Sequence, residues 1–268
     1  MKSIAIASPK GGVGKTTVAL QLAHAIVKRG YRTLLVDGDP QGAIGLSLSK
    51  ELNASPGFSA FIAEGRALTD VVIHTRIEGF SLLPIGRIGP YETESFGAAL
   101  SDGTRLARLT EEAASDHDVV VFDTPSGFGG ITTGVLRASS HVVSPIQAEP
   151  VALRALTQLL EMIQVLRQES ADVTLAGLVV TMLQVRNEHS FDVARELLDQ
   201  FPQELLFSAN VPRDPVFLEA TAKGVPVGLL RRPAPPVTHV FDLIAAELED
   251  RIGLTEQTRN DEPQPFLV

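Results

Sequence analysis

Short runs of apolar residues alternate along this chain with longer stretches in which apolar residues recur every three or four positions. The short runs are typical of strands that are buried on both faces, and they occupy residues 3–7, 33–37, 80–85, 118–123, 141–146, 175–181 and 205–209. The helical spacing occupies residues 18–27, 44–52, 58–64, 105–114, 152–168, 191–201 and 237–252. Because strands and helices alternate at this rhythm, the pattern predicts an α/β fold with a doubly wound, mostly parallel sheet flanked by helices.

The chain length of 268 residues suits a single α/β domain, which we expect to span residues 1–254. A surface loop leading into a helix is expected at 86–101, where glycine and proline are frequent. Residues 255–268 turn polar and contain Pro263 and Pro265, so a disordered tail is predicted there. No apolar run reaches the ~18 residues that a membrane span requires, which predicts a cytoplasmic protein without membrane insertion.

The composition limits the classes of metal site and partner. The chain has no cysteine, which excludes disulfides, thiolate metal sites and iron-sulfur clusters. Its formal net charge is −9, from 32 acidic and 23 basic residues, so the whole chain should repel nucleic acid unless basic residues gather on one face. An acidic chain of this kind favours a basic partner, such as a positively charged peptide.

Residues 8–17, with the sequence SPKGGVGKTT, have the form of a phosphate-binding loop between a strand and a helix. Glycine lets backbone amides approach a polyanion, and the amides and dipole of the following helix N-terminus attract it. Lys15 would reach the β- and γ-phosphates, and the Thr16 hydroxyl would ligate Mg²⁺. The nucleotide contacts predicted from this loop are Gly11, Gly12, Val13, Gly14, Lys15, Thr16 and Thr17.

Acidic residues end two of the predicted strands. Asp37 and Asp39 follow the apolar run at 33–37, in the string D-x-D-P-Q-G, and Asp123 ends the run at 118–123. In a doubly wound sheet, ligands bind at the carboxyl ends of the strands. A carboxylate that ends such a run faces the Mg²⁺ shell in P-loop enzymes, and the glycine-rich loop at 124–130 could change its order with the state of the γ-phosphate.

The strings K-G-G-V-G-K-T-T and D-x-D-P-Q-G resemble the ParA/MinD group of deviant Walker A ATPases, and are closer to ParA. The resemblance implies ATP and Mg²⁺ as cofactors, with Asp37 and Asp123 holding magnesium waters. It also implies catalytic roles for Lys10, Lys15 and Asp39: Lys10 crosses a dimer interface to the partner's nucleotide, and Asp39 orients the attacking water. It implies a homodimer on ATP binding, an adaptor of ParB or similar type that stimulates slow hydrolysis, and possible association with the nucleoid.

Two further sets of residues are candidates for binding. The turn at 211–215 takes the place of a similar turn beside the base in this family, and no guanine-reading N-K-x-D string follows a strand, which favours adenine. Met182, Pro212 and Arg213 are therefore candidates to line the base, although as core, turn and surface residues they would be ordinary. The basic residues that could contact DNA, or could simply be solubilising charges, are Arg186, Arg213, Lys223, Arg231 and Arg232.

The favoured function is an ATP-dependent dimerising switch that partitions or positions DNA or a protein cargo in a bacterial cell. A small-molecule-activating enzyme of the dethiobiotin-synthetase type shares this P-loop architecture and is the alternative from another class. A MinD-like spatial regulator is also possible. However, a membrane-targeting helix of the MinD kind would carry a basic polar face, and the polar face of the predicted helix at 237–252 is acidic.

Overall fold

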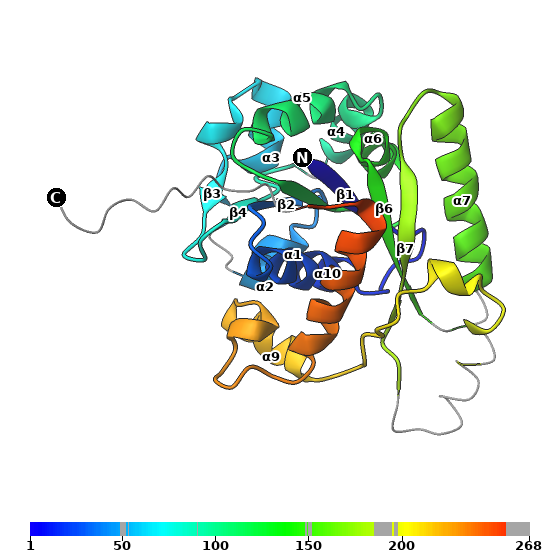
Figure 1. Ribbon diagram of the computed structural model, residues 1–268. Coiled ribbons are helices and arrows are strands. Elements are labelled where there is room, and N and C mark those ends of the chain that lie inside the picture. The colour runs from blue at the N-terminus through cyan, green and yellow to red at the C-terminus, as the bar shows by residue number, and fades with distance from the viewer. Residues whose placement is uncertain are drawn as a thin grey trace.

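The computed structural model describes residues 1–48, 52, 54–89, 91–147, 149, 152–184, 195 and 198–255. Its centre is a seven-stranded sheet in the order β3-β4-β2-β5-β1-β6-β7 (Figure 1). The strands are β1 Lys2–Ile6, β2 Thr33–Asp37, β3 Ile73–His74, β4 Phe80–Leu83, β5 Val119–Asp123, β6 His141–Gln147 and β7 Thr174–Thr181. Every neighbouring pair is parallel except β3 and β4, so the predicted doubly wound, mostly parallel sheet is confirmed.

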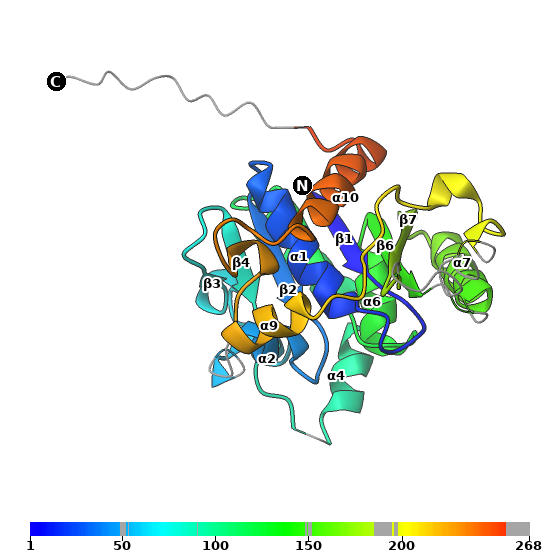
Figure 2. The ribbon, with the colours of Figure 1, turned by 90° about the horizontal axis from the view of Figure 1, so that it is seen from below.

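Helices cover both faces of the sheet (Figures 1 and 2). One layer contains α3 Gly57–Glu64, α4 Thr93–Leu100, α5 Thr104–Ala113, α6 Gly130–Ala138 and α7 Ala152–Gln168. The other contains α1 Lys15–Lys28, α2 Ala43–Leu48, α9 Val216–Lys223 and α10 Thr238–Ile252. Short 3-10 helices connect these elements, among them η2 Leu68–Asp70, η3 Gln203–Leu205 and η4 Val227–Leu229. None of the helices in the described part of the chain is both long and apolar enough to span a bilayer.

The continuous apolar runs follow from this two-sided cover. Successive side chains of a strand point to opposite faces of the sheet, so a strand covered on both faces needs an apolar residue at every position. In β5, Val119 and Val121 pack into the core beneath α1 and α10, whereas Val120 and Phe122 pack into the core beneath α3 to α6. All four side chains are fully buried.

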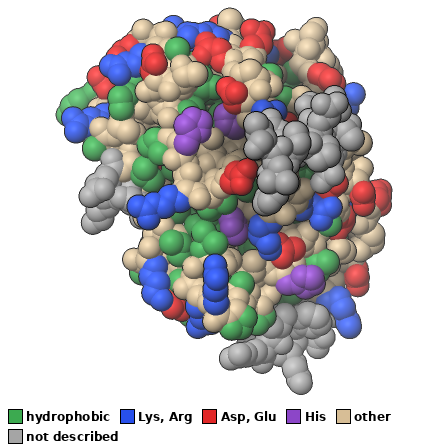
Figure 3. Space-filling view, turned by 60° about the vertical axis from the view of Figure 1, so that its left-hand side comes forward, with side chains coloured by type: hydrophobic (Ala, Val, Ile, Leu, Met, Phe, Trp, Pro, Cys, Tyr) green, Lys and Arg blue, Asp and Glu red, His purple; other side chains and the backbone are tan. Residues whose placement is uncertain are grey.

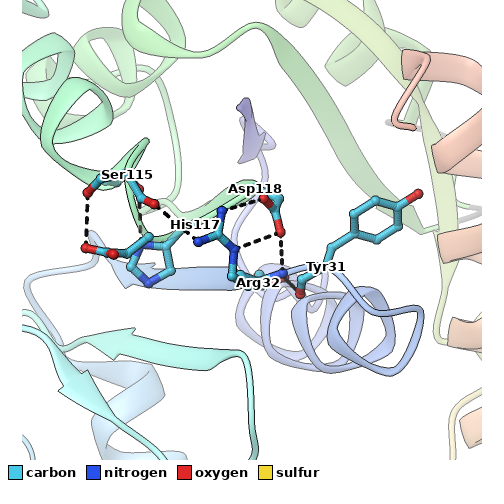
Figure 4. Close-up of polar contacts among 8 residues, drawn as sticks. Tyr31, Arg32, Ser115, His117 and Asp118 are labelled. Carbon is cyan, nitrogen blue, oxygen red and sulfur yellow. Dashed lines mark hydrogen bonds and ion pairs between the residues drawn. The ribbon is translucent and has the colours of Figure 1, made fainter. Parts of the chain in front are cut away.

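A polar cluster fixes the register of β2 against β5 at their amino ends (Figure 4). One Asp118 oxygen accepts hydrogen bonds from the Arg32 backbone amide at 2.8 Å and from its Nε at 3.2 Å, and the other accepts from a terminal guanidinium nitrogen at 2.8 Å. A second guanidinium nitrogen donates to the Ser115 carbonyl at 3.2 Å. From this point the strands run in parallel register to their carboxyl ends, where Asp37 lies opposite Asp123.

The prediction of a strand at 205–209 is wrong. The segment makes a single parallel bridge, between Leu206 and Leu178, and begins inside η3. The Phe207 amide donates to the Leu178 carbonyl at 2.9 Å, but an α10 side chain binds two carbonyls of the segment: Arg251 donates to Leu205, at 3.5 Å, and Leu206, at 2.6 Å. The short antiparallel strand β3 and the helices α6 and α9 were not predicted. Most of the predicted helix at 191–201, and all of the predicted tail beyond residue 255, lie outside the described residues.

The C-terminal helix α10 docks on the core through its apolar face. Phe241, Ile244 and Leu248 of α10 are buried in the core beneath α1. The hydroxyl of Tyr31, just after α1, donates to Glu249 at 2.8 Å, and Lys28 forms an ion pair with Asp242. The acidic face of α10 is therefore partly used inside the protein, to hold α1 against the sheet.

Helices α4 and α6 approach so closely that only glycine fits between them. A Cβ atom on Gly134 would lie 1.9 Å from the carbonyl oxygen of Leu100, and one on Gly130 would lie 2.4 Å from that of Gly97. Backbone at this distance cannot yield as a flexible side chain can, so any larger residue must push the helices apart.

Gly134→Ala should therefore destabilise the fold by about 2 to 3 kcal/mol, the usual cost of overpacking a core. In a domain of this size the melting temperature should fall by about 5 to 10 °C. Gly129→Ala is the matched control, because a Cβ atom there meets nothing within 4 Å. Thermal unfolding followed by circular dichroism measures both, and equal melting temperatures for the two variants would contradict the packing described here.

Candidate nucleotide site

The glycine-rich loop lies between β1 and α1, at the edge of the sheet where the parallel strands end. Gly12 and Gly14 have φ values of 75° and 87°, a left-handed conformation that side chains disfavour, and Gly14 is the N-cap of α1. No side chain caps this helix end, and its first turn holds no acidic residue. The amides of the loop and of the helix N-terminus are therefore available to an anion.

The side chain of Lys15 is held at this edge by the loop after β1 and the loop after β5. Its side chain is 7% exposed, and its Nζ donates to the Ser126 hydroxyl at 2.8 Å and to the Lys10 carbonyl at 3.3 Å. Burial lowers the pKa of Lys15, while the charges of Asp123 and Asp39 oppose that shift. A buried ammonium held by neutral oxygens is suited to receive a phosphate.

Asp37 and Asp123 lie side by side at the carboxyl ends of β2 and β5, and both are fully buried. Burial raises the pKa of Asp37 to about 7, although backbone amides donate hydrogen bonds to it. One of its oxygens accepts from the amides of Ile44, at 3.1 Å, and Gly45, at 3.4 Å, in the first turn of α2. Asp37 therefore also orients α2 against the site.

Asp123 is the less satisfied of the two carboxyl groups. Burial raises its pKa well above the ordinary value, and the neighbouring Asp37 raises it further. The Thr16 hydroxyl lies near enough to lower this pKa, yet neither Asp123 oxygen has a hydrogen-bond partner among the described residues.

Two buried acids, one without partners, form an arrangement that a cation relieves, so Thr16, Asp37 and Asp123 fit a Mg²⁺ shell. Within the described ranges, no three His, Asp or Glu side chains come together as metal ligands. Contact through waters, as the sequence predicts for the two acids, suits this arrangement.

The other two predicted catalytic residues lie at the same edge but make different contacts. Asp39 accepts a hydrogen bond from the Gln41 amide at 2.9 Å, which shapes the turn after β2. Lys10 extends to the opposite side of the loop, toward the end of β6. There its Nζ donates to Gln147 at 3.1 Å and forms an ion pair with Glu149.

A pocket of about 370 Å³ adjoins the loop on the side of β7. It contains all three residues that the sequence suggests for a base, Met182, Pro212 and Arg213, and it also reaches Gly14 and Thr17. The remaining lining residues are Val18, Thr181, Val211, Asp214, Pro215, Phe217 and Leu218. Most of these are apolar, which suits a flat heterocycle next to a phosphate site.

Two observations explain how the 211–215 turn is held over the pocket. Leu183 and Pro212 form a parallel bridge, and the Arg213 amide donates to the Leu183 carbonyl at 3.1 Å. Met182, between the strand and the bridge, has a φ of 56°, which is unusual for a residue with a side chain. This backbone conformation accompanies the placement of the Met182 side chain in the pocket.

Comparisons with known proteins agree with this geometry. A family model described as an AAA domain matches residues 1–175. The sporulation initiation inhibitor protein Soj of Bacillus subtilis is 31% identical over 230 residues, which are 84% of this chain and 90% of Soj. The chromosome partitioning protein ParA of Caulobacter vibrioides is 31% identical over 233 residues, which are 85% of this chain and 86% of that protein. This chain belongs to the ParA/MinD family of P-loop ATPases.

A solved structure adds the ligands of a relative. Cobyrinic acid a,c-diamide synthase from Mycobacterium smegmatis, with bound ADP and magnesium, aligns with a TM-score of 0.72 and 28% identity. The alignment covers 92% of this chain and 93% of that one. As a member of the ParA/MinD family this protein is an ATPase, and ATP and Mg²⁺ are its cofactors.

The structure thus brings the loop residues, the three acids and the three base candidates to one edge of the sheet. Arg186 lies outside the described residues. Sequence reasoning missed Ser126 and Thr181; the Thr181 hydroxyl is within hydrogen-bonding distance of the Val13 carbonyl, at 2.8 Å, and so ties β7 to the loop. Ser126 lies in the glycine-rich loop that the sequence had singled out, whereas nothing in the local sequence marks Thr181.

Lys15→Met should lower the affinity for ATP by at least about 100-fold, because a buried charge at the phosphates is lost. The melting temperature of the free protein should not fall, since methionine keeps the volume and removes a cation that burial disfavours. Lys2→Met, at the opposite end of β1 from the loop, is the control. Titration calorimetry and thermal unfolding decide the matter, and tight ATP binding by Lys15→Met would contradict the assignment of the loop.

Proposed function

We propose that this protein is an ATP-dependent dimerising switch of the ParA type, which partitions or positions DNA or a protein cargo in a bacterial cell. The observation that carries the proposal is the position of Lys10. It lies on the same loop as Lys15, but its side chain points away from Asp37 and Asp123, toward the carboxyl end of β6. Lys10 is therefore free of the local phosphate site and suited to reach a nucleotide in a second copy of the chain.

Each residue of the site has a proposed task. Bound ATP supplies the phosphoanhydride bond that is hydrolysed, and Mg²⁺ neutralises charge on its phosphates. Lys15 and the loop amides hold the phosphates, while Thr16, Asp37 and Asp123 hold the metal shell, the two acids through water. Asp39 orients the attacking water, and Lys10 supplies charge from the partner protomer.

The apolar pocket is the proposed adenine site. Met182 and Pro212 would lie against the faces of the base, and the Arg213 side chain lies at the pocket's exposed margin. The pocket reaches Gly14 and Thr17, so one ligand could fill it and the loop together.

A basic surface around α9 is the proposed contact with non-specific DNA. Arg213, Lys223, Arg231 and Arg232 are all exposed and lie within one segment of twenty residues. Figure 3 shows Lys and Arg side chains on the lower half of the molecule, around hydrophobic side chains. Dimerisation would double their number, and phosphate contacts add up, so the ATP-bound dimer would hold DNA better than the monomer.

The proposed partner that stimulates hydrolysis is a basic adaptor peptide of ParB or similar type. The net charge of −9 favours such a partner electrostatically. A cytoplasmic protein that associates with the nucleoid when ATP is bound would fit both interactions.

A small-molecule enzyme is the second candidate, and one relative of known structure favours it. The Mycobacterium smegmatis relative is a cobyrinic acid a,c-diamide synthase. The residues that bind phosphate and metal would be the same for either function. The two functions differ in whether Lys10 acts across a dimer interface and in whether ATP hydrolysis needs a metabolite. A MinD-like spatial regulator would share the switch but act on a different surface.

Asp39→Ala and Lys10→Ala should have different effects on the same reaction. Asp39→Ala should bind ATP and dimerise but hydrolyse ATP at least about 100-fold more slowly, because its water is not oriented. Lys10→Ala should bind ATP as a monomer and also lose hydrolysis. Light scattering with ATP-Mg²⁺ and phosphate release measure both properties, with Lys28→Ala as a lysine control.

One pattern of results would favour the enzyme instead. Wild type and Asp39→Ala would both stay monomeric at micromolar concentration, and ATPase activity would arise only when a small metabolite is added.

The double variant Arg231→Ala/Arg232→Ala should weaken binding to long duplex DNA by about tenfold or more at low salt, equally for all sequences. A dimer would lose four charges, so the slope of log affinity against log salt should fall by up to about 3.6. Arg154→Ala/Arg167→Ala, on the exposed side of α7, is the control for general loss of charge. If wild type with ATP binds no duplex at low salt, the surface to which the switch binds is not DNA.

A further inference from the structure

Lys10 is occupied within its own chain. Its Nζ donates to the Gln147 side-chain oxygen at 3.1 Å and pairs with the Glu149 carboxylate. Both partners lie at the carboxyl end of β6, about 140 residues away in the sequence. The side chains of Lys10 and Glu149 are 32% and 48% exposed, so the ion pair lies at the surface, where another molecule could compete for it.

Lys10 cannot keep these contacts and at the same time reach a nucleotide across a dimer interface. A lysine ammonium is a single compact charge at the end of a flexible stem. When Lys10 extends to a nucleotide in a second protomer, it leaves Gln147 and Glu149. By symmetry this happens twice in each homodimer, so every dimer formed would cost two of these ion pairs.

The contacts also adjoin the proposed base pocket. The Gln147 amide nitrogen donates to the Met182 sulfur at 2.8 Å, so one amide group links Lys10 to a residue that lines the pocket. A Cβ atom on Gly14 would lie 3.8 Å from the Met182 methyl group, which places Met182 beside the phosphate loop as well. A ligand in the pocket therefore touches the residue that supports Gln147.

We propose that Glu149 and Gln147 form an intramolecular latch that holds Lys10 in the monomer and sets the protein concentration at which ATP produces the dimer. This inference rests on the proposed dimerising switch. In the monomer, Glu149 keeps Lys10 on its own surface and so limits dimerisation before the nucleotide site is filled. Glu149 is a positioning residue, because it acts through Lys10 and does not touch the reacting atoms.

The size of the effect follows from the exposure of the pair. A partly exposed ion pair shifts an equilibrium by about two- to fivefold. Because a dimer breaks two latches, the effect on its dissociation constant is squared, to about 4- to 25-fold. Salt screens exposed charges, so the effect should shrink at high ionic strength.

The test is the full-length variant Glu149→Gln, which keeps the size of the side chain and removes its charge. With a non-hydrolysable ATP analogue and Mg²⁺, sedimentation equilibrium should give a dimer dissociation constant about 4- to 25-fold lower than that of wild type. The gap should close in 0.5 M salt. Nucleotide affinity measured at protein concentrations below dimerisation should not change, which a general structural defect would not reproduce.

Glu169→Gln is the matched control. Glu169 is also 48% exposed and also forms an ion pair, with Arg137, away from the nucleotide loop. It should leave the dimer dissociation constant unchanged, because its partner does not move on dimerisation.

The other outcomes overturn the latch in distinguishable ways. Equal dissociation constants for wild type and Glu149→Gln would mean that Glu149 does not restrain Lys10. A weaker dimer in Glu149→Gln would mean that Glu149 works across the interface. If neither protein dimerises with the analogue, the proposed switch itself fails, and the latch fails with it.

Discussion

The side-by-side burial of Asp37 and Asp123 is the constraint on which the rest of the site depends. The Arg32–Asp118 cluster sets the register of β2 and β5 at one end, and five residues later the two carboxyl groups meet at the other. Two acids that close together in a low dielectric resist ionisation, as their raised pKa values indicate. The fold therefore holds two carboxyl groups that ionise readily only when a cation is bound beside them, and Lys15 supplies positive charge nearby.

A structural change at this site can be transmitted to helices α6 and α4, because these two helices are in close backbone contact. Ser126, which accepts a hydrogen bond from Lys15, lies four residues before Gly130, the first residue of α6. Helix α6 in turn packs backbone to backbone on α4 at Gly130 and Gly134. A shift of the loop at 124–129 cannot be absorbed by side-chain rearrangement at that contact, so the two helices would have to move together.

The sequence predicts those parts of the fold whose cause is local. The runs at 33–37 and 118–123 can be recognised as strands because both faces of each strand are covered and nearly every position before the final acid is apolar. The acids that end these runs, Asp37 and Asp123, mark the edge of the sheet where ligands bind. The segment predicted as a strand at 205–209 instead makes a single bridge to β7, and Arg251, more than forty residues away, binds the carbonyls of Leu205 and Leu206. The contacts of Lys10 with Glu149 and of Thr181 with Val13 join distant segments, and no local pattern contains them.

The overall charge and the basic surface are compatible because electrostatics in salt solution is local. At physiological ionic strength a charge is felt over about 8 Å, so a net charge of −9 spread over the whole chain does not determine the potential at any one surface. Some of the acidic charge is matched internally, as in the pair of Asp242 with Lys28 and the pair of Glu247 with Arg251 inside α10. In the part of the chain that the structure describes, Arg231 and Arg232 form no ion pair, so their charge remains available to a polyanion. In the proposed switch, the same reasoning places the decisive electrostatics of dimerisation in the few side chains around Lys10, where one charge would change partner, and not in the total charge of the two protomers.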